Sequence, residues 1–160
     1  MAVYERATRI DAPLSEVWAF HRHPDGLVEL TPDWADLRIE SIRGPDGESD
    51  PDELVVGTEV EVSVRPFGVG PRQRGTTRFV EVECGEETAH FRDVMVEGPF
   101  ARWDHLHRFV ADGDRTQLLD RVHWAMPGGL VGEGVAALGW PGLAVVFWYR
   151  HRRTRELLEG

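Results

Sequence analysis

The residues best suited to chemistry lie in one predicted β-hairpin, which runs from Arg102 to Ala125. In its first strand, His105 and His107 share a face, because successive side chains of a strand point to opposite sides. The run Asp112-Gly113-Asp114 predicts a two-residue turn. Either placement of that turn sets odd positions of the first strand opposite even positions of the second. Asp120 therefore joins the face that carries the two histidines.

Aromatic side chains share this face. Trp103 and Phe109 alternate with the histidines in the first strand, and Trp124 lies four residues after Asp120 in the second. The other face carries charged residues such as Arg108. A three-residue loop would reverse the pairing, but it would set apolar residues opposite charged ones. We therefore expect the face with the histidines to be the concave face of the sheet.

Three interpretations of His105, His107 and Asp120 stay open. A histidine held by a buried carboxylate acts as a general acid or base near neutral pH. Alternatively, Asp120 and a histidine satisfy each other's hydrogen bonds in a partly polar lining. In the third interpretation, the same groups fix a polar group of a ligand inside an apolar pocket.

A metal site is the less favoured alternative. The spacing His105-x-His107 puts two imidazoles on one strand face, as in some zinc sites. No third ligand is visible by spacing, although His21 and His23 follow the first predicted helix and could approach. We therefore expect no metal and no cofactor.

The elements that must position these residues are a set of strands followed by one long helix. Residues 3–10 predict a strand, and Pro13 predicts the start of a short helix. A second short helical segment covers residues 25–30. The remaining strands are expected at residues 37–42, 58–65, 74–83, 88–97, 102–110 and 116–125. Helices segregated from an antiparallel sheet define the α+β class.

The C-terminal part is the most apolar. Residues 130–149 could be a membrane span, but Glu133, four glycines and Pro141 interrupt the stretch. We predict instead that Pro141 begins the main helix after a looser glycine-rich segment. Residues 135–158 should contain one buried helix of four or more turns, because a helix that is apolar nearly all round is buried in a fold.

Composition limits the classes of function. The chain has 160 residues, which fits a single domain over residues 1–160. Its net charge is -10 and its basic residues are all arginine, so nucleic acid is not an expected partner. The N-terminus lacks the apolar core of a signal peptide, and Cys84 stands alone, so we expect a cytoplasmic protein. A homodimer stays open.

Several short phrases occur along the chain in a fixed order. They are Asp11-Ala12-Pro13-Leu14, Val17-Trp18-Ala19-Phe20-His21, Leu30-Thr31-Pro32, Trp34, Gly98-Pro99-Phe100, Trp103, His105, His107, Phe109, Thr116, Asp120 and Pro127-Gly128. With the order of elements, they resemble the SRPBCC superfamily of START, Bet v 1 and polyketide-cyclase-like helix-grip proteins. Within it, the chain is similar to the ligand-binding SRPBCC domain group. The glycine-rich approach to the last helix and the acidic segment 44–53 depart from that pattern.

This resemblance implies a curved seven-stranded antiparallel sheet wrapped around the final helix, with a cavity between them. It implies no single reaction, because a fold does not define a function. Our first expectation is an apolar small-molecule partner, hydrophobic or amphipathic, such as a lipid, polyketide or aromatic compound. The alternatives are a cofactor-independent cyclase, dehydratase or hydrolase, and a co-chaperone-like interaction module. We expect the ligand to contact Phe20, Trp34, Met95, Trp103, His105, His107, Phe109, Asp120, Trp124 and Phe147.

Overall fold

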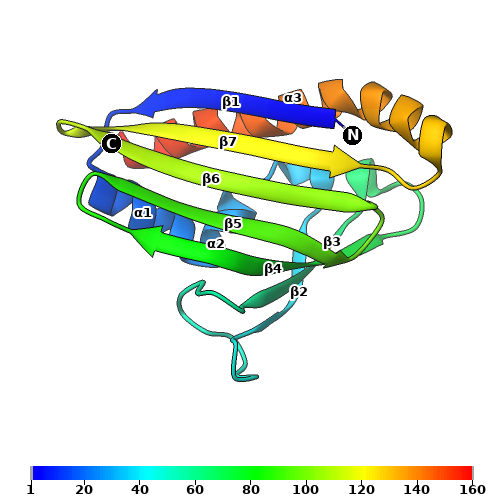
Figure 1. Cartoon of the computed structure of the whole chain (residues 1–160), viewed down its shortest axis with the longest axis horizontal. Coiled ribbons are helices and arrows are strands. Elements are labelled where there is room, and N and C mark those ends of the chain that lie inside the picture. The colour runs from blue at the N-terminus through cyan, green and yellow to red at the C-terminus, as the bar shows by residue number, and fades with distance from the viewer. Residues whose placement is uncertain (1, 160) are drawn as a thin grey trace.

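The computed structural model describes residues 2–159, except for the side chains of residue 133 and residues 135–140. The predicted order of one strand, two short helices, six strands and a long helix is confirmed (Figure 1). The strands are β1 (Ala2–Ile10), β2 (Arg38–Arg43), β3 (Glu59–Val64), β4 (Gln73–Cys84), β5 (Thr88–Glu97), β6 (Arg102–Asp112) and β7 (Arg115–Ala125). The helices are α1 (Leu14–Arg22), α2 (Asp25–Glu29) and α3 (Gly129–Leu158), with short 3-10 turns η1 (Asp33–Ala35) and η2 (Pro66–Gly68).

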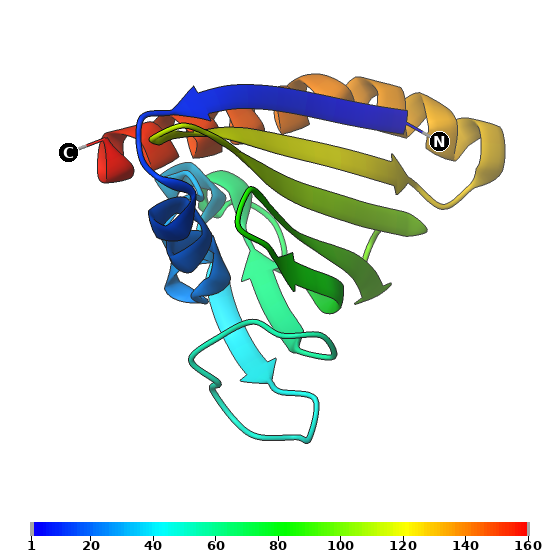
Figure 2. The same ribbon diagram turned by 60° about the vertical axis from the view of Figure 1, so that its left-hand side comes forward.

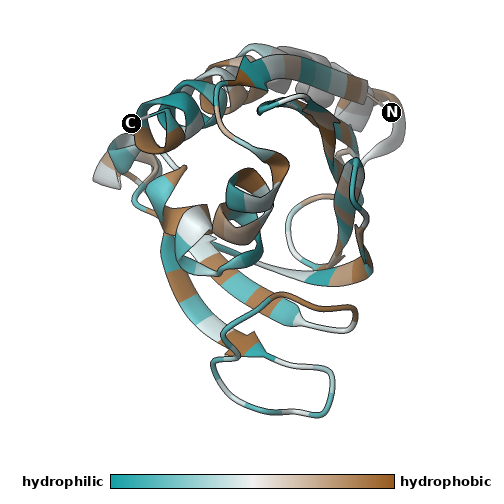
Figure 3. Ribbon diagram, turned by 90° about the vertical axis from the view of Figure 1, so that its left-hand side faces the viewer, coloured by the Kyte–Doolittle hydropathy of each residue, from teal (hydrophilic) through white to brown (hydrophobic). Residues whose placement is uncertain are grey.

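The seven strands form one antiparallel sheet in the order β1-β7-β6-β5-β4-β3-β2. The sheet bends strongly from β1 to β2 (Figure 2). Two register irregularities in β4, at Thr76/Thr77 and Phe79/Glu81, contribute to this curvature, because an extra residue in one strand bends it. Hydrophobic and hydrophilic bands alternate along the strands, as a sheet with one buried face requires (Figure 3). The predicted α+β helix-grip architecture is confirmed.

Two apolar clusters anchor the helices to the sheet. Helix α1 packs against β6 and β7, and its Trp18 lies against Phe91 of β5 and Phe109 of β6. Helix α3 packs against β1 and β7, where Phe147 stacks on Tyr4 with ring centroids 5.3 Å apart. The two helices therefore cover different parts of the concave face.

The start of α3 differs from the prediction. The helix begins at Gly129, and Pro141 lies inside it rather than at its first turn. A proline inside a helix removes one backbone hydrogen bond and crowds the carbonyl four residues earlier, but the turns on either side still form their own bonds. Gly128 and Gly129 have positive φ angles of 105° and 60°, and they reverse the chain from β7 into the helix.

The burial of α3 also differs from the prediction. Phe147, His151 and Thr154 are buried, whereas Val145 and Trp148 on the same helix are 51% and 46% exposed. The helix is thus buried on one side only, because the sheet grips it without closing over its outer face. No helix in the part of the chain that the structure describes has the length and apolar character that crossing a membrane requires.

Candidate functional site

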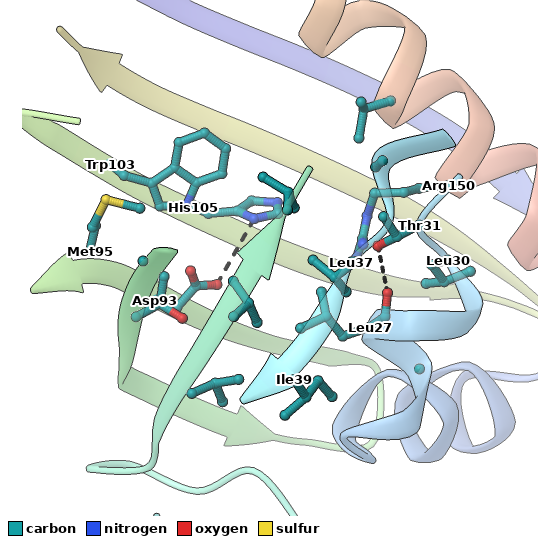
Figure 4. Close-up of a pocket in the computed structure, with 18 of the residues that line it drawn as sticks. Leu27, Leu30, Thr31, Leu37, Ile39, Asp93, Met95, Trp103, His105 and Arg150 are labelled. Carbon is teal, nitrogen blue, oxygen red and sulfur yellow. Dashed lines mark hydrogen bonds and ion pairs between the residues drawn. The ribbon is translucent and has the colours of Figure 1, made fainter. Parts of the chain in front are cut away.

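A cavity of about 410 Å³ lies between the concave face of the sheet, α2 and α3 (Figure 4). Its wall is mainly apolar and includes Leu27, Leu37 and Ile39. Trp34 lines the cavity and is 36% exposed, so the cavity approaches the surface there. Trp34 stacks on Phe67, whose ring centroid is 5.1 Å away.

Six residues of the expected ligand set line this cavity. They come from η1, β5, β6 and α3, and they are Trp34, Met95, Trp103, His105, His107 and Phe147. Elements that are distant in sequence thus contribute to one wall.

Four residues of the expected set lie outside the lining of this cavity. Phe109 and Trp124 are almost fully buried in the two apolar clusters beneath α1 and α3. Phe20 lies on α1 beside His21, outside the lining. Asp120 is buried behind the histidines that do reach the cavity.

Asp120 is the centre of a buried hydrogen-bond network. Its Oδ1 atom lies 2.7 Å from Nε2 of His105, and its Oδ2 atom lies 2.6 Å from Nε2 of His151. Nδ1 of His151 lies 2.7 Å from the hydroxyl of Thr8. Nδ1 of His107 is 3.2 Å from Oδ1 of Asp120 but lacks hydrogen-bond geometry. The observed pairs agree with the predicted parity, which puts Asp120 on the face of the two histidines, and they set His107 opposite Asp120.

A second buried carboxylate, Asp93 of β5, faces the same histidines from the other side. Its Oδ2 atom lies 3.0 Å from Nε2 of His107. The same atom lies 3.9 Å from Nδ1 of His105 (Figure 4). The two imidazole centroids are 3.5 Å apart, and Phe91 stacks on His107 at 4.0 Å. The two histidines are therefore held between two carboxylates.

The surroundings shift the pKa values of Asp120, His105 and His107 in different directions. Burial by itself raises the pKa of Asp120, but the hydrogen bonds from His105 and His151 and the close approach of His107 outweigh it and hold that pKa well below its usual value. Burial and the neighbouring His107 lower the pKa of His105. Burial also acts to lower the pKa of His107, yet the nearby carboxylates Asp120 and Asp93, the second of which is hydrogen-bonded to it, outweigh burial and raise that pKa. His107 is thus the preferred proton carrier of the stacked pair.

Arg150 of α3 brings a cation to the same cavity (Figure 4). Its guanidinium carbon lies 5.9 Å from the ring centroid of Phe147. Burial lowers the pKa of Arg150, and the charges of Asp120 and Asp93 oppose that shift. Among the side chains that the structure describes, none forms a hydrogen bond or ion pair with this guanidinium. An arginine carries five N–H donors in a plane, so this one is equipped to bind an anion.

Sequence reasoning missed Asp93, Arg150 and His151. Asp93 had a usable signal, because it lies two residues before Met95, which was expected to face inward from the same strand. Arg150 and His151 had none, because they follow an almost wholly apolar stretch that leaves the rotation of the helix undetermined. His21 was considered as an approaching group, and it does line the cavity.

The curved sheet, the gripped helix and the cavity between them define a helix-grip protein. Over residues 10–139 the sequence matches the polyketide cyclase/dehydrase and lipid transport family, and the chain belongs to that family. No curated protein matches the chain significantly.

Solved structures support the same fold. Norcoclaurine synthase from Thalictrum flavum, in complex with dopamine and hydroxybenzaldehyde, is 19% identical with a TM-score of 0.64, covering 99% of this chain and 87% of that one. A protein from Arthrobacter aurescens is 16% identical with a TM-score of 0.68, covering 96% and 86%. A protein from Thermus thermophilus is 15% identical with a TM-score of 0.63, covering 96% and 97%. At these identities the likeness concerns the fold alone.

Proposed function

We propose that this protein binds an amphipathic small molecule whose apolar body fills the cavity and whose anionic end meets Arg150. The carrying observation is the guanidinium of Arg150, which lines the cavity without a counter-ion at bonding distance among the described side chains. A partly buried charge without a hydrogen-bonded partner is costly, and a ligand anion would offset that cost with charge-assisted hydrogen bonds. The mainly apolar wall favours an acyl or aromatic body over a sugar.

The test compares matched ligands that differ only in the charge of the polar end. Long-chain and polycyclic aromatic carboxylates are titrated beside their methyl esters, with binding followed by calorimetry and tryptophan emission. Trp34 and Trp103 line the cavity and Trp124 does not, so replacing both Trp34 and Trp103 by phenylalanine should remove most of the ligand-dependent signal. We expect carboxylates to bind more tightly than their esters.

Arg150→Gln should weaken carboxylate binding about 10- to 100-fold, the loss of one charge-assisted hydrogen-bonded contact. Binding of the methyl esters should stay nearly constant. Arg152→Gln is the matched control, because Arg152 lies on the same helix but is exposed and paired with Glu156 at 2.9 Å. Equal effects of the two changes, or equal binding of acids and esters by the original protein, would contradict the proposal.

A second candidate is acid–base catalysis of the cyclase, dehydratase or hydrolase type. The observation that favours it is the buried pair of His105 and Asp120, joined at 2.7 Å behind a cavity that His105 lines. A carboxylate that orients a neutral imidazole is a common general-base arrangement. Mass spectrometry of the compounds recovered from the same titrations would reveal a product. A reaction that survives His105→Gln would exclude this residue as the base.

A further inference from the structure

Three buried side chains at the cavity wall offer a set of metal ligands. Asp93, His105 and His107 each present one ligand atom, and these atoms all lie within 4.8 Å of one another. We propose that these three residues bind a divalent transition-metal ion such as Zn²⁺, with a remaining coordination position directed into the cavity. The proposal needs no organic ligand, and so it stands apart from the function proposed above.

The ligand atoms follow from the hydrogen bonds that are already made. Nε2 of His105 is held by Asp120 at 2.7 Å, and a carboxylate oxygen only accepts, so Nε2 carries the hydrogen. Nδ1 of the same ring therefore has a free lone pair, and it lies 3.9 Å from Oδ2 of Asp93. Both roles come from one tautomer of His105.

His107 has the opposite arrangement. Its Nε2 atom lies 3.0 Å from Oδ2 of Asp93, and its Nδ1 atom lies 3.2 Å from Oδ1 of Asp120 without a formed hydrogen bond. A small adjustment lets Nδ1–H donate to Asp120, which leaves the lone pair of Nε2 for the ion. Ligand atoms about 2.0–2.1 Å from a tetrahedral ion lie roughly 3.3 Å apart, so separations of 3.0 and 3.9 Å bracket that value.

The residues behind the ligands complete the arrangement. Metal-bound histidines usually donate their other ring N–H to a carboxylate, which fixes the tautomer and ring orientation. Asp120 supplies that carboxylate, and His151 holds its second oxygen at 2.6 Å. All four of Asp93, His105, His107 and Asp120 are buried, so their orientations are fixed by packing. The third ligand was invisible to spacing because it comes from β5, beside the strand that carries the two histidines.

The negative charges of Asp93 and Asp120 favour a divalent cation at this site. Two carboxylates flank the pair of imidazoles, and an ion bound between His107 and Asp93 would replace the proton that joins them. Two histidines and one carboxylate with an open position form a ligand set suited to Zn²⁺ and other first-row divalent ions. Arg150 lies on the same cavity, so an ion there would favour an anionic oxygen as its next ligand.

The experiment uses the full chain after treatment with a chelator. Zn²⁺ binding is measured by calorimetry, and Co²⁺ binding by the visible absorption bands of the cobalt ion. We expect one ion per chain, with absorption typical of four- or five-coordinate cobalt. Asp93→Asn and His105→Gln should each weaken binding about 100-fold or more, since each removes a ligand.

The matched control is His90→Gln. His90 lies on the other face of β5, where Glu81 and Glu83 approach its ring nitrogens at 3.2 and 4.0 Å and could hold an adventitious ion. The proposal requires this change to leave the main binding event intact. Loss of binding in His90→Gln, with retention in Asp93→Asn, would overturn it.

A second measurement covers the case in which the ligand variants fail to fold. X-ray absorption of the zinc-loaded original protein counts the imidazoles around the ion. Two imidazoles are expected at the proposed site, and one imidazole would assign the ion to the His90 surface and refute the proposal. Absence of any zinc or cobalt binding by the original protein would also refute it.

Discussion

Four histidines are buried near the cavity and Asp120, and they differ in their hydrogen-bond partners. His105 and His151 occupy the two oxygens of Asp120, whereas His107 lies between Asp120 and Asp93. His21 is separate, because its Nδ1–H donates to the carbonyl of Val17 at 2.8 Å, within its own helix. Burial lowers the pKa of His21 to about 3, from an ordinary value of 6.5. This residue is therefore neutral in the folded protein over a wide pH range.

The neutral state of His21 predicts a specific loss of stability in acid. Below about pH 6.5 the unfolded chain binds a proton at His21 that the folded protein does not bind until pH falls to about 3. The free energy of unfolding therefore falls as pH falls through this window, by up to about 1.4 kcal/mol per pH unit. Between about pH 7.5 and pH 4.5 this one residue should account for roughly 2.5 kcal/mol.

Urea denaturation of the original protein and of His21→Phe at the two pH values checks this prediction. The phenylalanine variant should lose about 2.5 kcal/mol less on acidification, because the buried ring no longer titrates. His23→Phe is the control, since the side chain of His23 is half exposed. Identical acid losses in the original protein and His21→Phe would show that burial at this position carries no such penalty.

At the scale of elements, the β6–β7 hairpin brings His105, His107 and Asp120 together. Its pairs run from Asp112 opposite Arg115 to Arg102 opposite Ala125, without a bulge. The turn is therefore Gly113-Asp114, and Gly113 has a φ angle of +61°. A two-residue turn with a positive φ at its first position favours glycine there.

Gly113→Ala should destabilise the protein by about 1 to 2 kcal/mol, because an L-residue is strained at this φ angle. Asp114→Ala is the matched control at the second turn position, which has no positive φ and should change stability by much less. Chemical denaturation measures both values. A neutral Gly113→Ala would mean that the turn can shift, and with it the register of the two strands.

The elements also show where sequence reasoning succeeded and where it ended. Strand parity and one turn signal were enough to put Asp120 on the face of His107, because the period of two leaves only two choices. Helix α3 offered no such rule. Its apolar stretch gave no preferred side, so the inward positions of Arg150 and His151 depended on packing against β1 and β7.

At the scale of the whole molecule, the cavity is the space that the two apolar clusters leave between them. One cluster joins α1 to the sheet around Phe91 and Phe109, and the other joins α3 to β1 and β7 around Tyr4 and Phe147. Protein interiors are normally close-packed, so a space of about 410 Å³ represents stability that the fold does not gain. The order of elements predicted such a cavity only through the family resemblance, since no local pattern encodes an unfilled volume.

Filling the cavity with a larger side chain should stabilise the fold and weaken ligand binding. Val62 of β3 lines the cavity and packs at the edge of the first cluster, so Val62→Phe would extend a ring into the empty space. The larger side chain fills about 50 Å³, which should raise the free energy of unfolding by roughly 1 kcal/mol. The same change should weaken carboxylate binding at least about tenfold, because it occupies the volume proposed for the ligand.

Val3→Phe, on a half-exposed position of β1, is the control and should alter neither quantity appreciably. Denaturation and calorimetry on the same samples separate the outcomes: a variant that is more stable and still binds would place the ligand elsewhere, whereas a variant that is less stable would show that the cavity cannot accept the ring.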